Sequence, residues 1–256
     1  MSSSTHVERT HGIARGEVVS NVLVREIREL SPAIKGFTLH VCNPNLTFRP
    51  GQWVDLHIPE ENIVGGYSIT STPLCLQTAG TIDLAIQYST HPPAHWMHTK
   101  CKVADKLSIQ VGGDFYYYPS SPGEERELLL VAGGMGINPL FSILQHQVHA
   151  HSSWKVKLLF VARTASSLLF KDQLERLCAN SDAIEVQYFV TREVSLNPKI
   201  NSCRITREDL TQAVATLDLL NLFCFVCGPP PMTDNVIQCL RDVGVPQNCI
   251  QYEKWW

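Results

Sequence analysis

The sequence has no uninterrupted apolar stretch long enough to cross a membrane, and it has no excess of basic residues. Its longest apolar run, Leu128 to Leu144, is broken by three glycines, an asparagine and a proline. It therefore falls short of the roughly 20 residues of a transmembrane helix. The 256 residues carry 21 lysines and arginines against 24 aspartates and glutamates, a net charge of −3. That balance offers no electrostatic attraction to nucleic acid or anionic membranes. We expect neither a transmembrane segment nor a nucleic-acid partner.

Motifs of several common kinds of site are also missing. Nine cysteines, an odd number, are scattered along the chain without a secretory signal, which predicts free thiols in a reducing compartment. Neither the C-x4-C-x2-C spacing of plant-type iron–sulfur proteins nor the G-x-S-x-G turn of many hydrolases occurs. The histidines form no complete ligand set, so no metal site is predicted. The pair Cys224 and Cys227 lies in an apolar run typical of a buried strand, which does not favour redox chemistry.

The first half of the chain alternates between apolar and polar residues with a period of two, the pattern of a strand with one buried face. Turn signals separate the alternating runs, which are Phe37–Val41, Val54–Ile58, Ile82–Tyr88 and Leu107–Val111. Several short strands spaced in this way predict an antiparallel β-barrel or sandwich, which we place at residues 17–122. Residues 1–16 are polar and rich in serine and histidine, and we expect them to form a flexible segment.

The second half changes character after the polar stretch Ser120–Glu125. Apolar runs typical of parallel strands buried on both faces alternate with helical segments. The predicted strands are Glu127–Ala132, Val156–Val161, Ile184–Val190 and Leu222–Cys227, and the predicted helices are Asn138–His149, Ser166–Leu177, Arg207–Val214 and Met232–Val243. This alternation predicts a doubly wound parallel sheet over residues 123–256. We therefore expect an all-β barrel domain followed by an α/β domain.

The strongest local motif joins a buried strand to a helix. The strand that starts near Leu128 is followed by Gly133, Gly134, Met135, Gly136, Ile137, Asn138 and Pro139. Glycines allow a tight turn and the close approach of a phosphate, and a helix N-terminus offers N–H groups and a partial positive charge. A tight turn without a ligand is the alternative. The strand–turn–helix context favours the binding of a pyrophosphate.

A second motif, Cys227-Gly228-Pro229-Pro230-Pro231-Met232, also follows a strand and precedes a helix. Ligands of doubly wound sheets lie beyond the carboxyl ends of the strands, so both motifs are expected at one crevice. A thiol there would pack against a flat ring, and a rigid proline-rich loop is the alternative. Arg163, after the strand Val156–Val161, would meet a 2′-phosphate or stack on adenine. NAD is favoured over NADP, because no second basic residue stands next to Arg163 in the sequence.

Together these segments resemble the ferredoxin–NADP reductase superfamily, which pairs a flavin-binding β-barrel with a nicotinamide-binding α/β domain. The matching segments follow the family's order and span about residues 17–256. They are Arg49–Trp53, Tyr67–Pro73, Gly112–Phe115, Ala132–Pro139, Val161–Thr164, Leu169–Asp172, Cys227–Met232 and Glu253–Trp256.

The resemblance implies a site for FAD or FMN in the barrel. Tyr67 would lie along the isoalloxazine ring and Ser68 near its reactive edge, while Ile69 and Thr70 would offer backbone contacts. The Gly112–Gly113 turn and the segment His95–His98 would approach the flavin phosphate, and Glu253 and Trp256 would close the flavin pocket. For the nicotinamide dinucleotide, the resemblance implies binding at Gly133–Pro139, with Gly228 and Pro229 nearby and Cys227 facing the nicotinamide. Ser68, Cys227 and Glu253 are the candidate catalytic residues.

One position departs from the family. Its flavin motif Arg-x-Tyr-Ser is here Gly65-Gly66-Tyr67-Ser68, and the family's arginine pairs with a flavin phosphate. A charge-assisted hydrogen bond contributes roughly 1.5–3 kcal/mol. Its loss corresponds to about 10- to 100-fold weaker binding. Three outcomes stay open: loose binding of flavin, binding as the mononucleotide, and no binding.

Two functions from different classes follow. The leading hypothesis is a flavin-dependent NAD(P)H oxidoreductase that passes hydride from the nicotinamide to flavin and electrons to an unknown acceptor, with a haem or iron–sulfur protein as one candidate. The competing hypothesis is a non-catalytic protein that binds NAD(H). The resemblance also implies a mitochondrial location, with the cytoplasm as the alternative, although the N-terminus gives little support for import.

Overall fold

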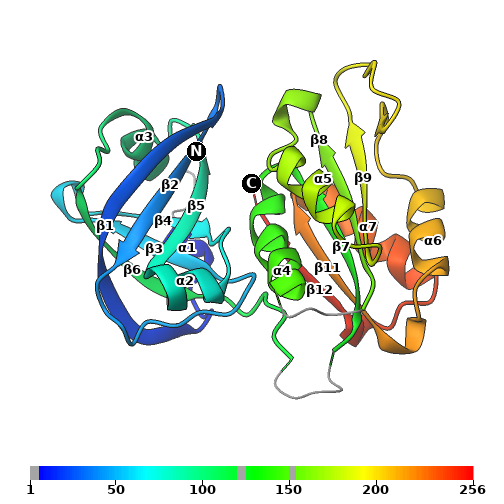
Figure 1. The fold of residues 1–256 in the computed structure, drawn as a ribbon, viewed down its shortest axis with the longest axis horizontal. Helices are drawn as coiled ribbons and strands as arrows, with labels where there is room; N and C mark the ends of the chain where they lie inside the picture. The colour runs from blue at the N-terminus through cyan, green and yellow to red at the C-terminus, as the bar shows by residue number, and fades with distance from the viewer. Residues whose placement is uncertain (1–5, 120–124, 150–153, 256) are drawn as a thin grey trace. The chain divides into compact units, whose positions relative to one another are not determined.

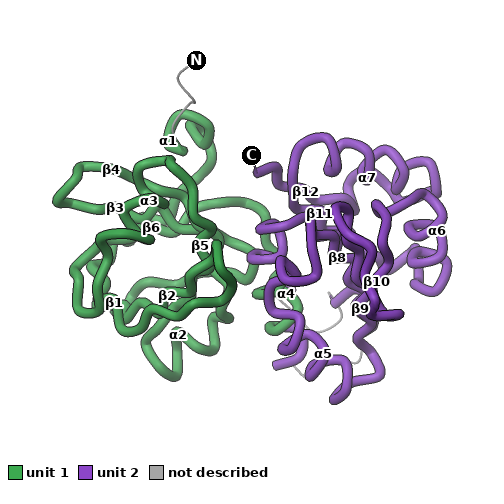
Figure 2. The backbone as a smooth tube through the Cα atoms, turned by 90° about the horizontal axis from the view of Figure 1, so that it is seen from above, with its two compact units in different colours: residues 1–118, 141–146 green, residues 119–140, 147–256 purple. Residues whose placement is uncertain are grey.

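The structure is a computed structural model that describes residues 6–119, 125–149 and 154–255. It divides into two compact units, which we call unit 1 and unit 2 (Figure 2). Unit 1 comprises residues 1–118 and 141–146, and unit 2 comprises residues 119–140 and 147–256. The predicted domain boundary, between residues 122 and 123, lies outside the described residues.

Unit 1 is a curled antiparallel sheet of six strands in the order β4-β3-β6-β1-β2-β5 (Figure 1). An isolated antiparallel bridge between Ile69 and Leu84 links the end of β4 to β5, so the two edge strands approach each other. The strands are β1 Arg15–Ser31, β2 Ile34–Val41, β3 Trp53–Ile58, β4 Ile63–Ser68, β5 Thr81–Gln87 and β6 Lys106–Gly112. The helices of this part of the chain are α1 His6–Arg9, η1 Pro59–Glu61, α2 Pro73–Ala79 and α3 Pro92–Thr99. The predicted all-β barrel is thus confirmed.

Residues on both faces of β3 are buried. Val54, Leu56 and Ile58 lie among the buried apolar residues of unit 1, whereas Trp53 and Asp55 alternate with them and so point to the opposite face. The residues of that opposite face are also buried, so another segment of the chain covers it.

The covering segment comes from the N-terminus. Within residues 6–16, which the sequence predicts to be a flexible segment, residues 6–9 form α1 and β1 begins at Arg15. His6 is only 3% exposed, and its ring packs on Trp53 of β3 with 4.8 Å between the ring centroids. Composition alone does not show that a polar side chain of this segment has a buried partner.

Unit 2 is a six-stranded parallel sheet in the order β10-β9-β8-β7-β11-β12 (Figure 1). The strands are β7 Glu127–Gly133, β8 Val156–Ala162, β9 Ile184–Val190, β10 Ile200–Asn201, β11 Leu222–Gly228 and β12 Ile250–Lys254. The helices of this part of the chain are η2 Gly134–Gly136, α4 Ile137–His149, η3 Ala165–Ser167, α5 Lys171–Ala179, α6 Arg207–Ala215, η4 Leu219–Asn221, α7 Pro230–Asp242 and η5 Gln247–Cys249, and residues 141–146 of α4 belong to unit 1. The predicted doubly wound α/β domain is confirmed.

Helices cover both faces of this sheet. Leu210 of α6 and Ile237 of α7 share one apolar cluster with Leu129 of β7 and Val226 of β11. Figure 1 shows α5 on the opposite face. β7 is buried along its whole length, as its continuous apolar sequence predicts.

Two elements of unit 2 differ from the sequence predictions. The helix predicted to start at Ser166 begins at Lys171 instead. Phe170 has φ of 62°, in the left-handed region, so an α-helix cannot run through it. The C-terminal residues 250–254 form β12, a parallel strand paired with β11, which no periodicity in the sequence indicated.

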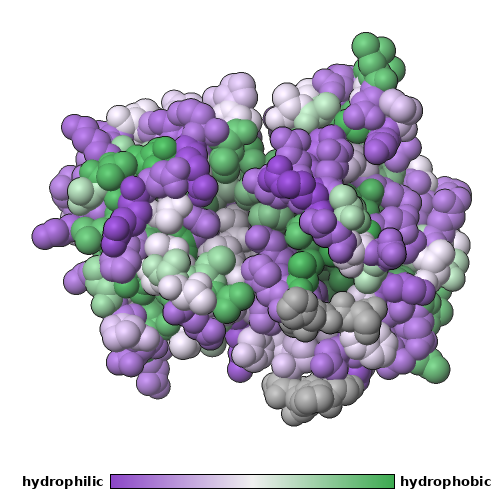
Figure 3. Space-filling model, in the orientation of Figure 1, coloured by the Kyte–Doolittle hydropathy of each residue, from purple (hydrophilic) through white to green (hydrophobic). Residues whose placement is uncertain are grey.

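The surface of the face seen in Figure 3 mixes hydrophobic with hydrophilic residues. Within the described ranges, no helix is long and apolar enough to cross a membrane.

Candidate functional site

The strand order of unit 2 reverses between β7 and β11. From β7 the chain proceeds through β8 and β9 on one side, and it then crosses to β11 and β12 on the other. In such sheets the ligand crevice lies at the carboxyl ends of the two strands that flank the reversal. The two predicted motifs, Gly133–Pro139 and Cys227–Met232, begin at the last residues of β7 and β11 and therefore meet at that place.

Close packing between the two turns accounts for most of their glycines. A Cβ on Gly136 would lie 2.1 Å from the carbonyl oxygen of Cys227, and one on Gly133 would lie 2.5 Å from Sδ of Met232. A Cβ on Gly228 would in turn lie 3.1 Å from Cα of Gly133. These three glycines let the turn after β7 pack on the turn after β11.

Gly134 differs from the other glycines of the motif. It is exposed, it has φ of +54°, and, apart from its neighbours in the chain, no atom of the described residues lies within 4 Å of where its Cβ would be. Met135 beside it is half-buried, and Ile137, Asn138 and Pro139 are buried in the first turn of α4. An exposed glycine turn that leads into a helix N-terminus fits the pyrophosphate of a dinucleotide.

The candidate catalytic residues Cys227 and Glu253 lie side by side. β11 and β12 pair so that Cys227 is opposite Glu253, and the indole N–H of Trp255 donates to Oε2 of Glu253 at 2.9 Å. Burial raises the pKa of the Cys227 thiol well above its ordinary value, and the charge of Glu253 raises it further, against a hydrogen bond to Trp255. The structure therefore brings together a neutral thiol, a carboxylate and an indole.

Two of the contacts implied for this end of the chain stay predictions. Cys227 has no exposed surface, and its place against a nicotinamide ring is one of them. Trp256 lies outside the described residues.

A second basic residue, Arg192, is distant from Arg163 in the sequence but lies beside it in the structure. The backbone N–H of Arg192, which follows β9, donates to the carbonyl oxygen of Arg163, which follows β8, at 2.9 Å. Both arginines are exposed. The pairing of parallel strands brings together the residues that follow them, and a scan for neighbours in the sequence could not find this pair. The argument for NAD from a lone Arg163 therefore no longer applies.

In unit 1 the predicted flavin residues lie at the end of β4. Tyr67 packs against the barrel core, and burial raises its pKa. Ser68 is buried and belongs to a different unit from Cys227 and Glu253. The N–H groups of Ile69 and Thr70 donate to the carbonyl oxygens of Gln52 and Asp83 at 3.0 and 2.9 Å. These two N–H groups are therefore not available to a flavin.

The Gly112–Gly113 turn holds an indole ring. A Cβ on Gly112 would lie 2.5 Å from the ring of Trp53, and one on Gly113 would lie 2.7 Å from its Nε1. Gly113 also has φ of +101°, where other residues are strained. Trp53 therefore fills the space that side chains at these two positions would need, and the approach of this turn to a flavin phosphate stays a prediction.

A buried ionic cluster, not predicted from the sequence, lies next to Trp53. Nε2 of His6 is 2.9 Å from Oδ1 of Asp55, and Nε of Arg15 is 2.6 Å from Oδ2. Burial alone would raise the pKa of Asp55. The hydrogen bonds from His6 and Arg15 and their charges more than offset it, and its pKa is lowered from the ordinary 3.8. The cluster ties the N-terminal segment to β3.

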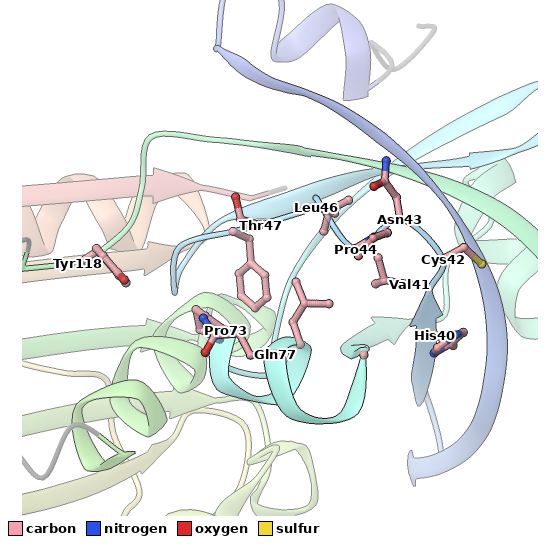
Figure 4. A pocket seen from close by; sticks show the side chains of 13 residues that line it. His40, Val41, Cys42, Asn43, Pro44, Leu46, Thr47, Pro73, Gln77 and Tyr118 are labelled. Atoms are coloured by element: carbon pink, nitrogen blue, oxygen red, sulfur yellow. The ribbon is translucent and has the colours of Figure 1, made fainter.

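Unit 1 also contains a pocket of about 640 Å³ between the end of β2, the loop that follows it and α2 (Figure 4). The residues labelled in Figure 4 are His40, Val41, Cys42, Asn43, Pro44, Leu46, Thr47, Pro73, Gln77 and Tyr118. None of the residues that line it is a predicted site residue, so the pocket is separate from the site of the sequence analysis.

Known proteins share this architecture. The flavohem-like FAD/NAD-binding domain of nitric oxide dioxygenase from Vibrio cholerae aligns with a TM-score of 0.78 over 92% of this chain and 98% of that domain, at 21% identity. A ferredoxin NADP+ reductase from Neisseria gonorrhoeae, with bound FAD and NADP, aligns with a TM-score of 0.74 over 93% of this chain and 98% of its own, at 22% identity. The fold is that of the ferredoxin reductases, as the sequence resemblance predicted.

The family follows from closer relatives. A model of the oxidoreductase NAD-binding domain matches residues 130–238, which include both glycine turns of unit 2. Oxidoreductase NAD-binding domain-containing protein 1 of Danio rerio is 39% identical, with 98% of this chain and 97% of that protein covered. The chain belongs to the family of oxidoreductase NAD-binding domain-containing protein 1. These relationships support an oxidoreductase-type function with a nicotinamide dinucleotide ligand.

Proposed function

We propose that this protein is an NAD(P)H oxidoreductase whose dinucleotide binds at the reversal between β7 and β11. The observation that carries the proposal is the exposure of Gly134. This residue belongs to the turn after β7, which packs tightly on the turn after β11 at the carboxyl edge of the sheet. The pyrophosphate lies at the turn Gly133–Gly136 and the N-terminus of α4. Cys227 and Glu253 shape the nicotinamide end of the site, and Arg163 contacts the adenosine end. Ser68 remains a proposed catalytic residue.

A flavin relay is the finer form of this proposal, and solved relatives of the fold with bound FAD support it. The acceptor of the electrons is then a partner protein or a small molecule. A second candidate is a protein that binds NAD(H) without turnover. It is favoured by Gly65, the position at which the family's arginine would hold a flavin phosphate. The mitochondrial location stays a prediction.

The test is titration of the full chain with NADH and with NADPH, followed anaerobically by absorbance at the nicotinamide band, with and without added FAD, FMN and ferricyanide. Saturable binding and acceptor-dependent loss of the reduced nicotinamide band are expected. Binding without oxidation under every combination would establish the second candidate. Failure of both nicotinamides to bind would overturn the proposal.

A further inference from the structure

The further inference concerns β4 of unit 1, and it does not depend on the dinucleotide site of unit 2. Gly65 and Gly66 are consecutive residues of this strand, so side chains at the two positions would point to opposite faces of the sheet. On each face the protein's own side chains occupy the space that a larger residue would need.

Tyr67 and Pro93 fill the space at Gly65. A Cβ on Gly65 would lie 2.6 Å from Cε2 and 2.8 Å from Oη of Tyr67, and 2.7 Å from Cβ of Pro93. Pro93 belongs to the first turn of α3, where its ring has little freedom to move. An arginine at position 65, as in the related flavin motif, would therefore require Tyr67 and Pro93 to move.

His6 fills the space at Gly66. A Cβ on Gly66 would lie between 2.0 and 2.3 Å from three atoms of the imidazole ring. The ring is held edge-on to Trp53 and paired with Asp55. Arg15 fixes the same carboxylate from the other side, and its remaining nitrogens donate to Thr10 and to the carbonyl oxygen of Ile13.

The N-terminus of α3 lacks donors at the same place. Its first two residues, Pro92 and Pro93, have no backbone N–H. A helix binds a phosphate through the free N–H groups of its first turn. The two prolines remove two of these groups from the helix that the family places on the phosphate side of the flavin.

The nearby cations already have partners or face other groups. Arg15 is committed to Asp55, and Nζ of Lys100 is 2.5 Å from Glu61. Arg9 lies near the N-cap of α3, where burial and the charges of Arg9 and His6 lower the pKa of His91. Arg9 is therefore the residue whose role in phosphate binding the experiment must exclude.

We propose that the described residues of unit 1 form no site for the phosphate of a flavin, because Tyr67, Pro93 and His6 fill both sides of the Gly65–Gly66 segment and Pro92 and Pro93 remove two of the N–H donors of α3. Any flavin that binds the barrel is held through its ring system alone. FAD, FMN and riboflavin then have equal affinities, and the protein does not retain a flavin nucleotide through desalting.

The binding test uses the full chain and titrates it with riboflavin, FMN and FAD, with flavin fluorescence and anisotropy as readouts. Dissociation constants within about threefold of one another, or no binding of any of the three, are expected. A preference of about tenfold or more for FMN or FAD overturns the proposal. If Arg9→Ala abolishes such a preference, Arg9 is the phosphate ligand. The affinity of the same sample for NADH is measured separately. A failure of the proposed dinucleotide site in unit 2 is thereby distinguished from a failure of this inference about unit 1.

The packing test uses thermal unfolding of Gly66→Ala, with Gly16→Ala as its matched control. Gly16 lies in β1 of the same unit, and its Cβ would be 3.7 Å from the nearest atom. Gly66→Ala is expected to lower Tm by about 5 °C or more, and Gly16→Ala to leave it nearly unchanged. In a His6→Ala background the added methyl group should lower Tm no further. A Gly66→Ala protein as stable as the control would show that His6 does not fill this space.

Discussion

The backbone of Gly136 lies so close to Cys227 that a Cβ on Gly136 would be 2.1 Å from the carbonyl oxygen of Cys227. This contact joins the turn after β7 to the end of β11, where the strand order of the parallel sheet reverses. Gly136, one of the three glycines of the predicted pyrophosphate motif, is therefore needed for packing. Gly134, two residues earlier, is the exposed one.

Gly136→Ala should destabilise the protein. The obstructing atoms belong to a central strand and cannot move aside, so we expect a loss of about 1–3 kcal/mol or more in the free energy of unfolding. Chemical denaturation followed by circular dichroism measures it. Loss of NADH binding with unchanged stability would contradict this assignment of Gly136.

Gly134→Asp should weaken dinucleotide binding without loss of stability. A carboxylate at the turn would repel a pyrophosphate, and we expect about tenfold or greater weakening of NADH binding. Aspartate tolerates the left-handed φ of this position comparatively well. Gly244→Asp is the matched control, because Gly244 also has positive φ and open space among the described residues but follows α7. Equal effects of the two variants on NADH affinity would reject Gly134 as a phosphate contact.

The His6–Asp55–Arg15 cluster should make stability sensitive to acid. The pKa of Asp55 is lower in the folded protein than its ordinary value of 3.8. The ionised Asp55 carboxylate therefore stabilises the folded protein above about pH 4. This stabilisation is lost as the pH falls through the folded-state pKa of Asp55. Urea unfolding between pH 2 and pH 6 should show a steeper loss in the native protein than in Asp55→Asn. Asp114→Asn, at an exposed position, should keep the native slope.

The buried thiols should resist modification. Cys224 and Cys227 have no exposed surface, and burial raises the pKa of both thiols. Cys42 and Cys203 are exposed. In the native protein at pH 8, we expect a disulfide reagent to label Cys42 and Cys203 on the order of 100-fold faster than Cys224 and Cys227. Mass spectrometry of digested samples gives the rates, and rapid native labelling of Cys227 would mean that its thiol is open to ligands.

Arg163 and Arg192 should affect NADPH more than NADH. The two guanidinium groups follow adjacent strands, and a 2′-phosphate is the part of NADP that such groups pair with. Either residue changed to alanine should weaken NADPH binding by about three- to tenfold more than NADH binding. Arg176→Ala, on the helix α5, serves as the charge control. An equal effect on both nucleotides would place the arginines elsewhere than at the 2′ position.

The order of the elements was predictable because periodicity is local. The alternation in β3 and the continuous apolar run of β7 each predict a strand from neighbouring residues. The start of α5 and the existence of β12 were not predictable, since a left-handed Phe170 and a pairing with β11 depend on the surrounding fold.

By itself, the sequence determined the two-domain class, the glycine turns of the dinucleotide motif and the substitution of Gly65 for an arginine. Tertiary structure alone decided what occupies the space beside each glycine: Cys227 at Gly136, Tyr67 and Pro93 at Gly65, and His6 at Gly66. A glycine in a sequence shows only that the position has no side chain. The segment that fills the gap comes from another part of the chain, and only the folded backbone brings the two together.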